Sequence, residues 1–123
     1  MKKKYRLKSN NDIQSLMRKK QTVGNSYFIV YYSENHDNIN FRFAIAVSKK
    51  YGNAVERNLM KRRVREIIRL SEIKQSYDFF IIAKLKSKTL NFNDIKLNIT
   101  KLLKRANILK GGRIWKIEKD FYY

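Results

Sequence analysis

Basic side chains are concentrated between residues 48 and 69, and their chemistry is that of a surface that binds a polyanion. Arg can donate two parallel hydrogen bonds to a phosphate, and Lys presents a compact positive charge to it. Asn can donate and accept hydrogen bonds at a ribose or at a hydrated metal ion. The residues that we expect to contact an anionic partner are Lys49, Lys50, Arg57, Asn58, Lys61, Arg62, Arg65 and Arg69.

Side chains that could perform acid–base or nucleophilic catalysis are scarce. The sequence has no cysteine, and its single histidine, His36, lies in a polar stretch that we expect to be an exposed turn. No second imidazole or thiol can pair with it, and the scattered acidic residues predict no two-metal site. Glu56 and Glu66 are better explained as supports for a helix, at its N-terminal end and in pairs with neighbouring Arg. The composition therefore disfavours an autonomous nuclease.

The chain as a whole is strongly basic. Among its 123 residues, 29 are Lys or Arg and ten are Asp or Glu, which gives a formal charge of +19. Charge of this size opposes compaction, and a nucleic acid would offset it because each neutralised phosphate releases counterions. A merely solvated basic surface and an anionic membrane surface are the alternatives. No apolar run is long enough to cross a membrane and the first residues do not resemble a secretory signal, so we expect a cytoplasmic protein.

The length and the charge predict one RNA-binding domain over residues 1–123. The hydrophobic pattern predicts the α+β class, with helices laid against a small sheet. The strand at 77–85 is apolar on both faces and is therefore expected to be central. In the strand at 41–48 one face is bulky and the other small, which leaves room for a ligand across it. The expected order is a helix at about 10–20, strands at 27–33 and 41–48, a helix at 54–72, a strand at 77–85, a helix from 91 that ends at Gly111-Gly112, and a tail at 113–123 that forms either a strand or a helix.

In the helix predicted at 54–72, apolar and basic residues fall on opposite faces. The apolar face holds Met60, Val64, Ile67 and Ile68. The opposite arc, about 100° wide on a helical wheel, holds Asn58, Lys61, Arg62, Arg65 and Arg69. An ordinary solvated face mixes charges of both signs, whereas this arc contains no acid, so the pattern favours a binding surface. Gly52 is expected to turn the chain so that Lys49 and Lys50 lie beside the helix start, where free N–H groups attract anions.

A dense motif in this region resembles a known family. The segments Ser48-Lys49-Lys50, Gly52-Asn53-Ala54-Val55, Arg57-Asn58, Lys61-Arg62 and Arg65-Glu66 are similar to the signature of the bacterial ribonuclease P protein component, whose Arg-Asn-x-x-Lys-Arg core is called the RNR motif. The order of elements from Leu7 to about Leu109 is similar as well. The resemblance implies a two-layer α/β sandwich with a small mixed sheet and a left-handed βαβ crossover, against the usual right-handed rule.

The resemblance also implies a function. The chain would be the protein subunit of ribonuclease P, a ribonucleoprotein endonuclease that hydrolyses precursor tRNA to remove its 5′ leader. One protein would bind one catalytic RNA, and the RNA, with Mg²⁺ that it mainly holds itself, would carry out the catalysis. A ribosomal-type protein or an RNA chaperone fits the size and charge equally well, and the dense motif is what separates ribonuclease P from these alternatives.

Roles for individual residues follow from the same resemblance. Arg57, Asn58, Lys61, Arg62 and Arg65 would contact the catalytic RNA, with Asn58 near a bound Mg²⁺. A cleft between the first helix and the sheet would hold the single-stranded leader, with Ile13, Met17 and Tyr31 along its wall. Members of the family often have aromatic residues where this chain has Ile13 and Met17, so base stacking is expected to depend on Tyr31 here.

Overall fold

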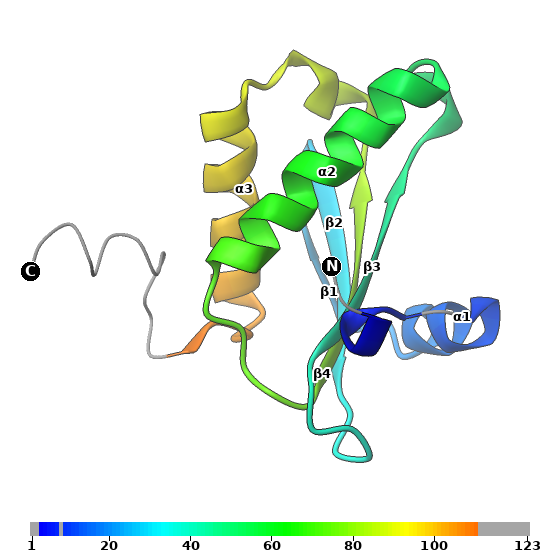
Figure 1. The fold of residues 1–123 in the computed structure, drawn as a ribbon, viewed down its shortest axis with the longest axis vertical. Coiled ribbons are helices and arrows are strands. Elements are labelled where there is room, and N and C mark those ends of the chain that lie inside the picture. Colours follow the sequence, from blue (N-terminus) through cyan, green and yellow to red (C-terminus); the bar gives the residue numbers. More distant parts are fainter. Residues whose placement is uncertain (1–2, 8, 111–123) are drawn as a thin grey trace, which may run out of the picture.

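The computed structural model describes residues 3–7 and 9–110, which form a four-stranded mixed sheet with helices on both faces (Figure 1). The three α-helices and the sheet position the site, and three short 3-10 helices complete the described part of the chain. The elements are η1 (Lys3–Tyr5), α1 (Asn10–Arg18), β1 (Thr22–Gly24), β2 (Phe28–Glu34), β3 (Arg42–Val47), η2 (Lys49–Tyr51), α2 (Ala54–Leu70), β4 (Tyr77–Ala83), η3 (Leu85–Thr89) and α3 (Phe92–Arg105).

The strand order is β1-β2-β4-β3, which confirms the central position predicted for the strand at 77–85. β4 is antiparallel to β2 and parallel to β3. In Figure 1 both β3 and β4 run upward, α2 lies in front of the sheet, and the chain passes through α2 to β4 on the left of β3. This path is a left-handed crossover, as the family resemblance implied, and it departs from the right-handed rule for such units.

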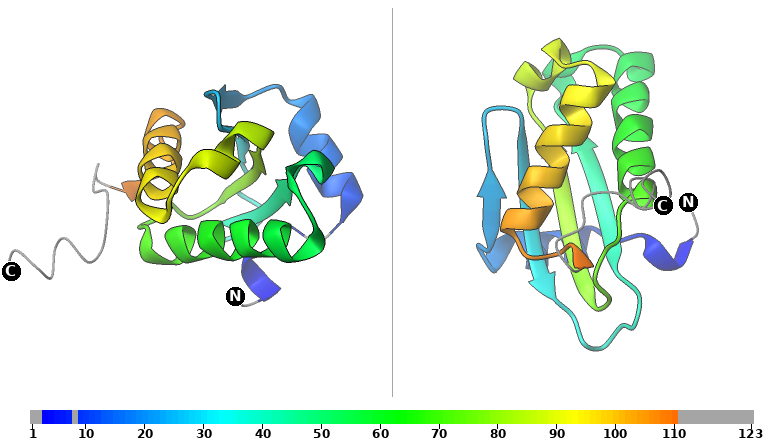
Figure 2. Two further views of the ribbon diagram at one scale, coloured as in Figure 1. Left: turned by 90° about the horizontal axis from the view of Figure 1, so that it is seen from above. Right: turned by 90° about the vertical axis from the view of Figure 1, so that its left-hand side faces the viewer.

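The two faces of the sheet have different cores. α2 and α3 cover one face, and Figure 2 shows α1 on the opposite side of the sheet. The main core, between the sheet and these two helices, includes Phe28, Val30, Phe79 and Ile81 from the strands, Met60, Val64, Ile67 and Ile68 from α2, and Ile95, Ile99, Leu102 and Leu103 from α3. A smaller cluster of Leu7, Leu16 and Phe80 lies beneath α1. The predicted two-layer sandwich is therefore present, and α1 adds a partial cover to its second face.

Each α-helix begins at a side-chain cap that the sequence displays. Ser9 accepts a hydrogen bond from the Asp12 N–H at 3.0 Å, and Asn91 accepts one from the Asp94 N–H at 2.8 Å. α2 begins with a complete capping box, in which the side chains of Asn53 and Glu56 each bond the backbone N–H of the other residue. These bonds satisfy donors that have no partner inside the helix.

The helix ends and one strand differ from the prediction. α1 ends at Arg18 and α2 at Leu70, each two residues before the predicted ends at residues 20 and 72. α3 ends at Arg105 rather than at the predicted Gly111-Gly112, because Asn107 adopts a left-handed conformation with φ of 61°. The glycine pair and the tail at 113–123 lie outside the described residues. The short strand β1 was not predicted, since three residues are too few to show an alternating pattern.

Candidate nucleic-acid interface

α2 presents its basic arc away from the core, as the helical wheel predicted. Met60, Val64, Ile67 and Ile68 are buried against the sheet and α3. On the outer side Asn58, Arg62 and Arg69 are exposed, while Lys61 and Arg65 are half-buried. The long side chains of the last two pack their stems against the protein and keep their charged ends accessible. The helix therefore presents a row of cations at fixed spacing on its outer surface, where a partner could contact them.

Most of these cations have no acidic partner among the described residues. This is true of Lys49, Lys50, Arg57, Lys61, Arg62 and Arg65, whereas other cations of the chain do form ion pairs. Unpaired charges on one face repel one another, and this repulsion is relieved when phosphates replace the missing counter-charges. Binding of a polyanion would therefore lower the electrostatic free energy of this face.

Arg69 differs from the rest of the arc. Its guanidinium donates hydrogen bonds to the carboxylate of Glu66, at 3.0 Å from Nε and 2.6 Å from Nη2. This bond raises the pKa of Arg69 and lowers the pKa of Glu66. The pairing of Glu66 with a neighbouring Arg was predicted, although the spacing is i,i+3 rather than i,i+4. Arg69 is thus partly neutralised within its own helix, so we expect it to contribute less to binding of an anion than the unpaired cations of the arc.

The segment before α2 is fixed by hydrogen bonds rather than by a special glycine conformation. Gly52 has φ of 162°, which is extended backbone open to any residue, so the expected turn conformation is wrong. Its role is spatial, because a Cβ at this position would lie 2.5 Å from Oε1 of Glu56. Ser48 caps η2 and leaves Lys49 and Lys50 exposed.

The N-terminal end of α2 already carries a carboxylate of the chain itself. Glu56 bonds the backbone N–H of Asn53 at 3.2 Å and lies 3.1 Å from Nζ of Lys88. The Asn53 N–H, and then Lys88, lower the pKa of Glu56 below its ordinary value. The N–H groups of Asn53 and Glu56 are therefore used within the protein, and a carboxylate already occupies the position where an anion was expected to bind.

Arg57 lies at the inner border of the basic surface. It is half-buried, and its Nε is a buried donor without a hydrogen-bond partner among the described residues. A buried donor without a partner costs free energy. A phosphate or ribose oxygen that reached this guanidinium would supply the missing acceptor.

On the second face of the sheet, the structure brings Ile13 and Tyr31 together. Both pack against the small cluster that contains Leu16 and Phe80, and the Tyr31 and Phe80 rings are stacked with centroids 6.5 Å apart. Ala44 and Ala46 of β3 border the same cluster, so the small face predicted for this strand is the one beside α1. This surface is apolar, partly open and next to an aromatic ring, which is suited to a nucleobase.

Met17 lies on α1 but outside that cluster. Its side chain is 36% exposed, so it is not a core residue beneath the helix. Phe80 was not among the predicted site residues, although it supports the ring of Tyr31. The signal that could have found it is the apolar character of the strand at 77–85 on both faces, which requires a covered residue on the side of Tyr31.

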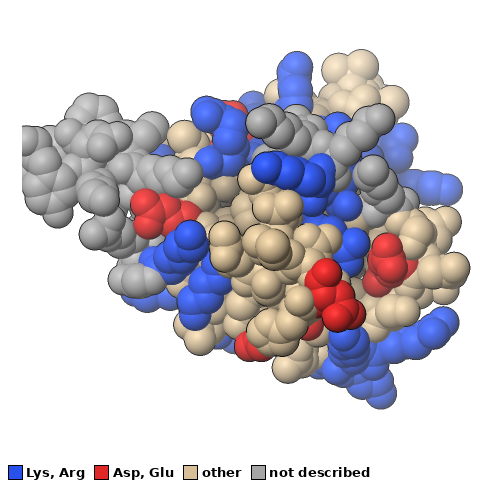
Figure 3. Space-filling view, turned by 60° about the horizontal axis from the view of Figure 1, so that its bottom comes forward, with Lys and Arg blue, Asp and Glu red and all other residues tan. Residues whose placement is uncertain are grey.

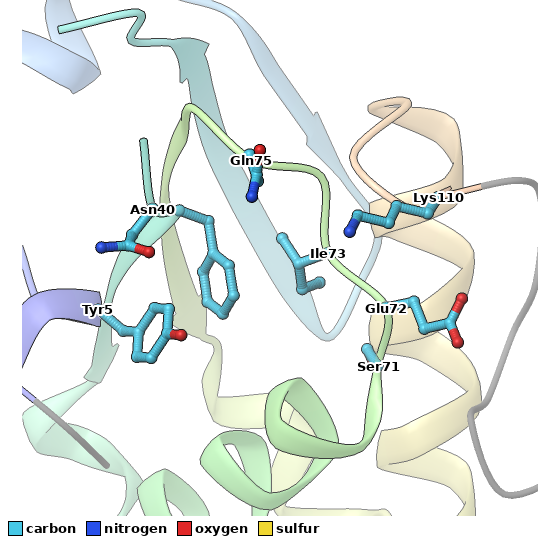
Figure 4. Close-up of a pocket in the computed structure, with 8 residues that line it drawn as sticks. Tyr5, Asn40, Ser71, Glu72, Ile73, Gln75 and Lys110 are labelled. Carbon is cyan, nitrogen blue, oxygen red and sulfur yellow. The ribbon is translucent and has the colours of Figure 1, made fainter. Parts of the chain in front are cut away.

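A cavity of about 370 Å³ lies elsewhere, at the end of the sheet near the C-terminal end of α2. Figure 4 shows Tyr5 and Lys110 on opposite sides of it, with Ile73 between them. None of the predicted site residues lines this cavity.

Figure 3 views the molecule toward the end that holds the β2–β3 connection: acidic side chains stand among uncharged ones in the middle, and Lys and Arg gather toward the margins. This end is therefore a poorer match to a polyanion than the outer face of α2.

The described residues contain no group of three or more His, Cys, Asp or Glu side chains that could hold a metal ion. His36 is exposed and lies 2.9 Å from the carboxylate of Glu34, as expected for a turn residue. No helix among the described residues is long and apolar enough to span a bilayer. The side chains of the basic surface are donors suited to phosphate and ribose oxygens, and the apolar surface beside Tyr31 is suited to a base.

Comparison with known proteins agrees with this geometry. Residues 1–107 match the family model described as Ribonuclease P. The ribonuclease P protein component of Phytoplasma australiense is 44% identical over 111 residues, covering 89% of this chain and 96% of the relative. That of Acholeplasma laidlawii is 41% identical over 112 residues, covering 89% and 96%. The solved ribonuclease P protein of Staphylococcus aureus superposes with a TM-score of 0.79 at 37% identity, covering 86% of this chain and 98% of that one. Since the family model matches residues 1–107 and these relatives are about 40% identical over most of the chain, this chain belongs to the ribonuclease P protein family.

Proposed function

We propose that this chain is the protein subunit of ribonuclease P and assists removal of the 5′ leader from precursor tRNA in the cytoplasm. The observation that carries the proposal is the row of cations on α2, from Arg57 to Arg65, that lack acidic partners among the described residues. Three of them, Arg57, Lys61 and Arg62, form the Arg-Asn-x-x-Lys-Arg motif together with Asn58, in a chain that belongs to this family. The face would bind the catalytic RNA, with one protein for each RNA.

The leader would lie on the second face of the sheet. Tyr31 and Ile13 offer an apolar wall there, and Met17, which is exposed, lies one helical turn after Ile13 on α1. A single strand binds to surfaces that combine stacking with nearby positive charge, and it needs no specific base contacts. In this arrangement the protein would contact catalytic RNA with one surface and substrate with another.

Hydrolysis of the phosphodiester would be carried out by the RNA. The side chains that form the two surfaces are mainly cations, amides and apolar groups, which can position RNA. Glu66, the acid beside the basic arc, is bonded to Arg69, so we assign the proton transfers of hydrolysis to the RNA. Mg²⁺ would supply charge stabilisation at the reacting phosphate when bound. Asn58 offers a single amide oxygen among cations, so it fits a contact to the hydration shell of an RNA-held Mg²⁺ and not a protein cage of six oxygen ligands.

Cleavage of precursor tRNA tests the proposal. The purified chain alone should not cleave, and a ribonuclease P RNA mixed with the chain should cleave at lower Mg²⁺ than the RNA alone, because the basic surface offsets phosphate repulsion. Robust cleavage by the RNA-free protein would overturn the assignment of catalysis to the RNA. Recovery of ribosomal RNA instead of one large RNA with the tagged protein would favour a ribosomal-type or chaperone function. Native mass spectrometry of the assembled complex measures the ratio of protein to RNA.

A further inference from the structure

A small hollow of about 220 Å³ opens at the outer edge of β3, and two arginines line it. Arg6 comes from the N-terminal segment and Arg65 from α2, while the rest of the lining is contributed by Leu7, Phe43, Ala44 and Ile45. None of the six residues is acidic. We call this place the β3-edge hollow.

The two guanidinium groups have no counter-charge among the residues that the structure describes. Among residues 3–7 and 9–110, neither Arg6 nor Arg65 makes a side-chain hydrogen bond or an ion pair. Two like charges that share one hollow raise the free energy of the folded chain, and an anion between them lowers it. Forked donors of this kind match the oxygens of a phosphate.

The backbone of β3 adds a donor to the same hollow. β3 is an edge strand, and the Phe43 carbonyl accepts a hydrogen bond from the Leu7 N–H at 3.0 Å on its outer side. Polar groups of alternate residues in a strand face the same edge, so the Ile45 N–H also faces outward. It has no backbone partner on that side among the described residues. An amide N–H between two arginines is a typical phosphate-binding combination.

The position of the hollow connects the two binding surfaces. Arg65 belongs to the basic face of α2, whereas Leu7 and Ala44 belong to the cluster on the second face of the sheet. The N-terminal segment lies against β3 through the bridge between Arg6 and Phe43. A phosphate in the hollow would thus lie at the border between the surface proposed for the catalytic RNA and the surface proposed for the leader.

We infer that Arg6, Arg65 and the Ile45 N–H form a single binding site for a phosphodiester group of the partner RNA, at the outer edge of β3. The inference rests on the proposed function and adds to it a residue, Arg6, that lies outside the α2 motif. It also explains how the outer edge of β3, which offers unpaired backbone groups, would be covered in the complex.

Affinity of the full-length chain for a ribonuclease P RNA, measured across a range of salt concentrations, tests the inference. Arg6→Ala and Arg65→Ala should each weaken binding by roughly tenfold, the effect of one lost hydrogen bond to a charged group. Each should make the slope of log K against log salt shallower by about one unit. The double variant should lose less than the product of the single losses, because both side chains hold one phosphate. Lys101→Ala is the matched control, because it removes one exposed positive charge on α3, outside the hollow. It should change the affinity for the RNA by less than about twofold if closeness of the charge to the bound phosphate matters more than net charge.

Two further measurements separate geometry from charge. Arg6→Lys keeps the charge but loses the fork, so it should recover only part of the affinity. In NMR spectra of the amide groups, the Ile45 N–H should shift on addition of the RNA. If inorganic phosphate shifts the Ile45 signal and chloride at equal ionic strength does not, the hollow binds phosphate by itself. If only the RNA shifts the signal, the polymer is needed. Either result supports the site.

The inference and the proposed function fail in different ways. Loss of affinity in Arg62→Ala, together with an unchanged Arg6→Ala and an unmoved Ile45 signal, would overturn the β3-edge hollow and leave the proposed function standing. Equal affinity of the unaltered chain for ribonuclease P RNA and for ribosomal RNA would overturn the proposed function. Circular dichroism of every variant excludes misfolding as the cause of a loss.

Discussion

The carboxylate of Glu66 lies 2.6 Å from the guanidinium of Arg69, one helical turn further along α2. The pair joins the end of the basic arc to the only acid of the helix beyond its first turn. Since both side chains are largely accessible, the pair contributes little to folding stability. Its main consequence is electrostatic, because Glu66 offsets one positive charge of the face that we propose binds RNA.

Removing this acid should strengthen RNA binding. Glu66→Gln frees Arg69 and removes one negative charge beside the binding surface, so the affinity for ribonuclease P RNA should rise several-fold at about 0.15 M salt, where the Debye length is about 8 Å. Glu72→Gln is the matched control, since it makes the same change beyond the C-terminal end of α2. Equal gains from the two variants would show that only net charge matters.

The orientation of α2 can be tested through its buried face. Val64 is completely buried, and Val64→Asp would place an unpaired carboxylate in the main core, destabilising the fold by about 3 kcal/mol or more. Leu59→Asp makes a similar change at a position of the same helix that is 40% exposed, and should cost far less. Urea unfolding followed by circular dichroism measures both. Equal destabilisation would contradict the assignment of faces.

Glu56 predicts a pH-dependent contribution to stability. Its pKa is lowered in the folded chain from an ordinary value of 4.5, so its contribution is present above about pH 4.5 and is lost as the pH falls through the lower, folded pKa. Glu56→Gln should therefore melt at a lower temperature than the unaltered chain at pH 7, and the difference should close in more acidic solution. Thermal melts between pH 3 and pH 7 measure it, and a constant difference would contradict the prediction.

We predict that a side chain at position 52 lowers the folding stability only through its contact with Glu56. A Cβ at Gly52 would displace the Glu56 carboxylate and break the capping box, at a cost of about 1 kcal/mol in the free energy of unfolding. The same Gly52→Ala change should cost little in a chain that already carries Glu56→Ala. A full cost in that background would show that the methyl group acts in some other way.

Leader recognition is predicted to depend on Tyr31 and to be improvable at Met17. Met17→Phe should tighten binding of leader-bearing precursor tRNA to the assembled complex, by less than the roughly 1–3 kcal/mol of a complete stack, because the thioether already contributes dispersion. Since Met17 is 36% exposed, the ring can be accommodated without overpacking the core. Tyr31→Ala should weaken the same binding.

Mature tRNA is the reference ligand for that prediction, because it has no leader to stack. Ile39→Phe is the matched protein control, an exposed apolar position in the β2–β3 connection. If precursor and mature tRNA change equally in the Met17 and Tyr31 variants, the second face of the sheet does not bind the leader.

Signals that are local in the sequence were enough to predict the helix starts, the two faces of α2 and the family. Ser9, Asn53 and Asn91 mark the starts of the helices because a cap needs only residues within one turn. The separation of Val64 from Arg62 and Arg65 on α2 follows from helical geometry alone, and so does the outward row of cations. The dense basic motif likewise identified the family, since its residues are nearly contiguous along the chain.

Other features depended on contacts between distant parts of the chain. Sequence patterns cannot show that Arg69 would bond Glu66 in preference to an RNA, that Tyr31 stacks on Phe80, or that Met17 remains exposed. The clearest case is Arg6 and Arg65, which are separated by nearly half the chain and line one hollow only because the N-terminal segment pairs with the outer edge of β3. A sheet joins strands by backbone hydrogen bonds that are common to all residue types, so its edges, and the side chains that meet there, are decided by the tertiary structure.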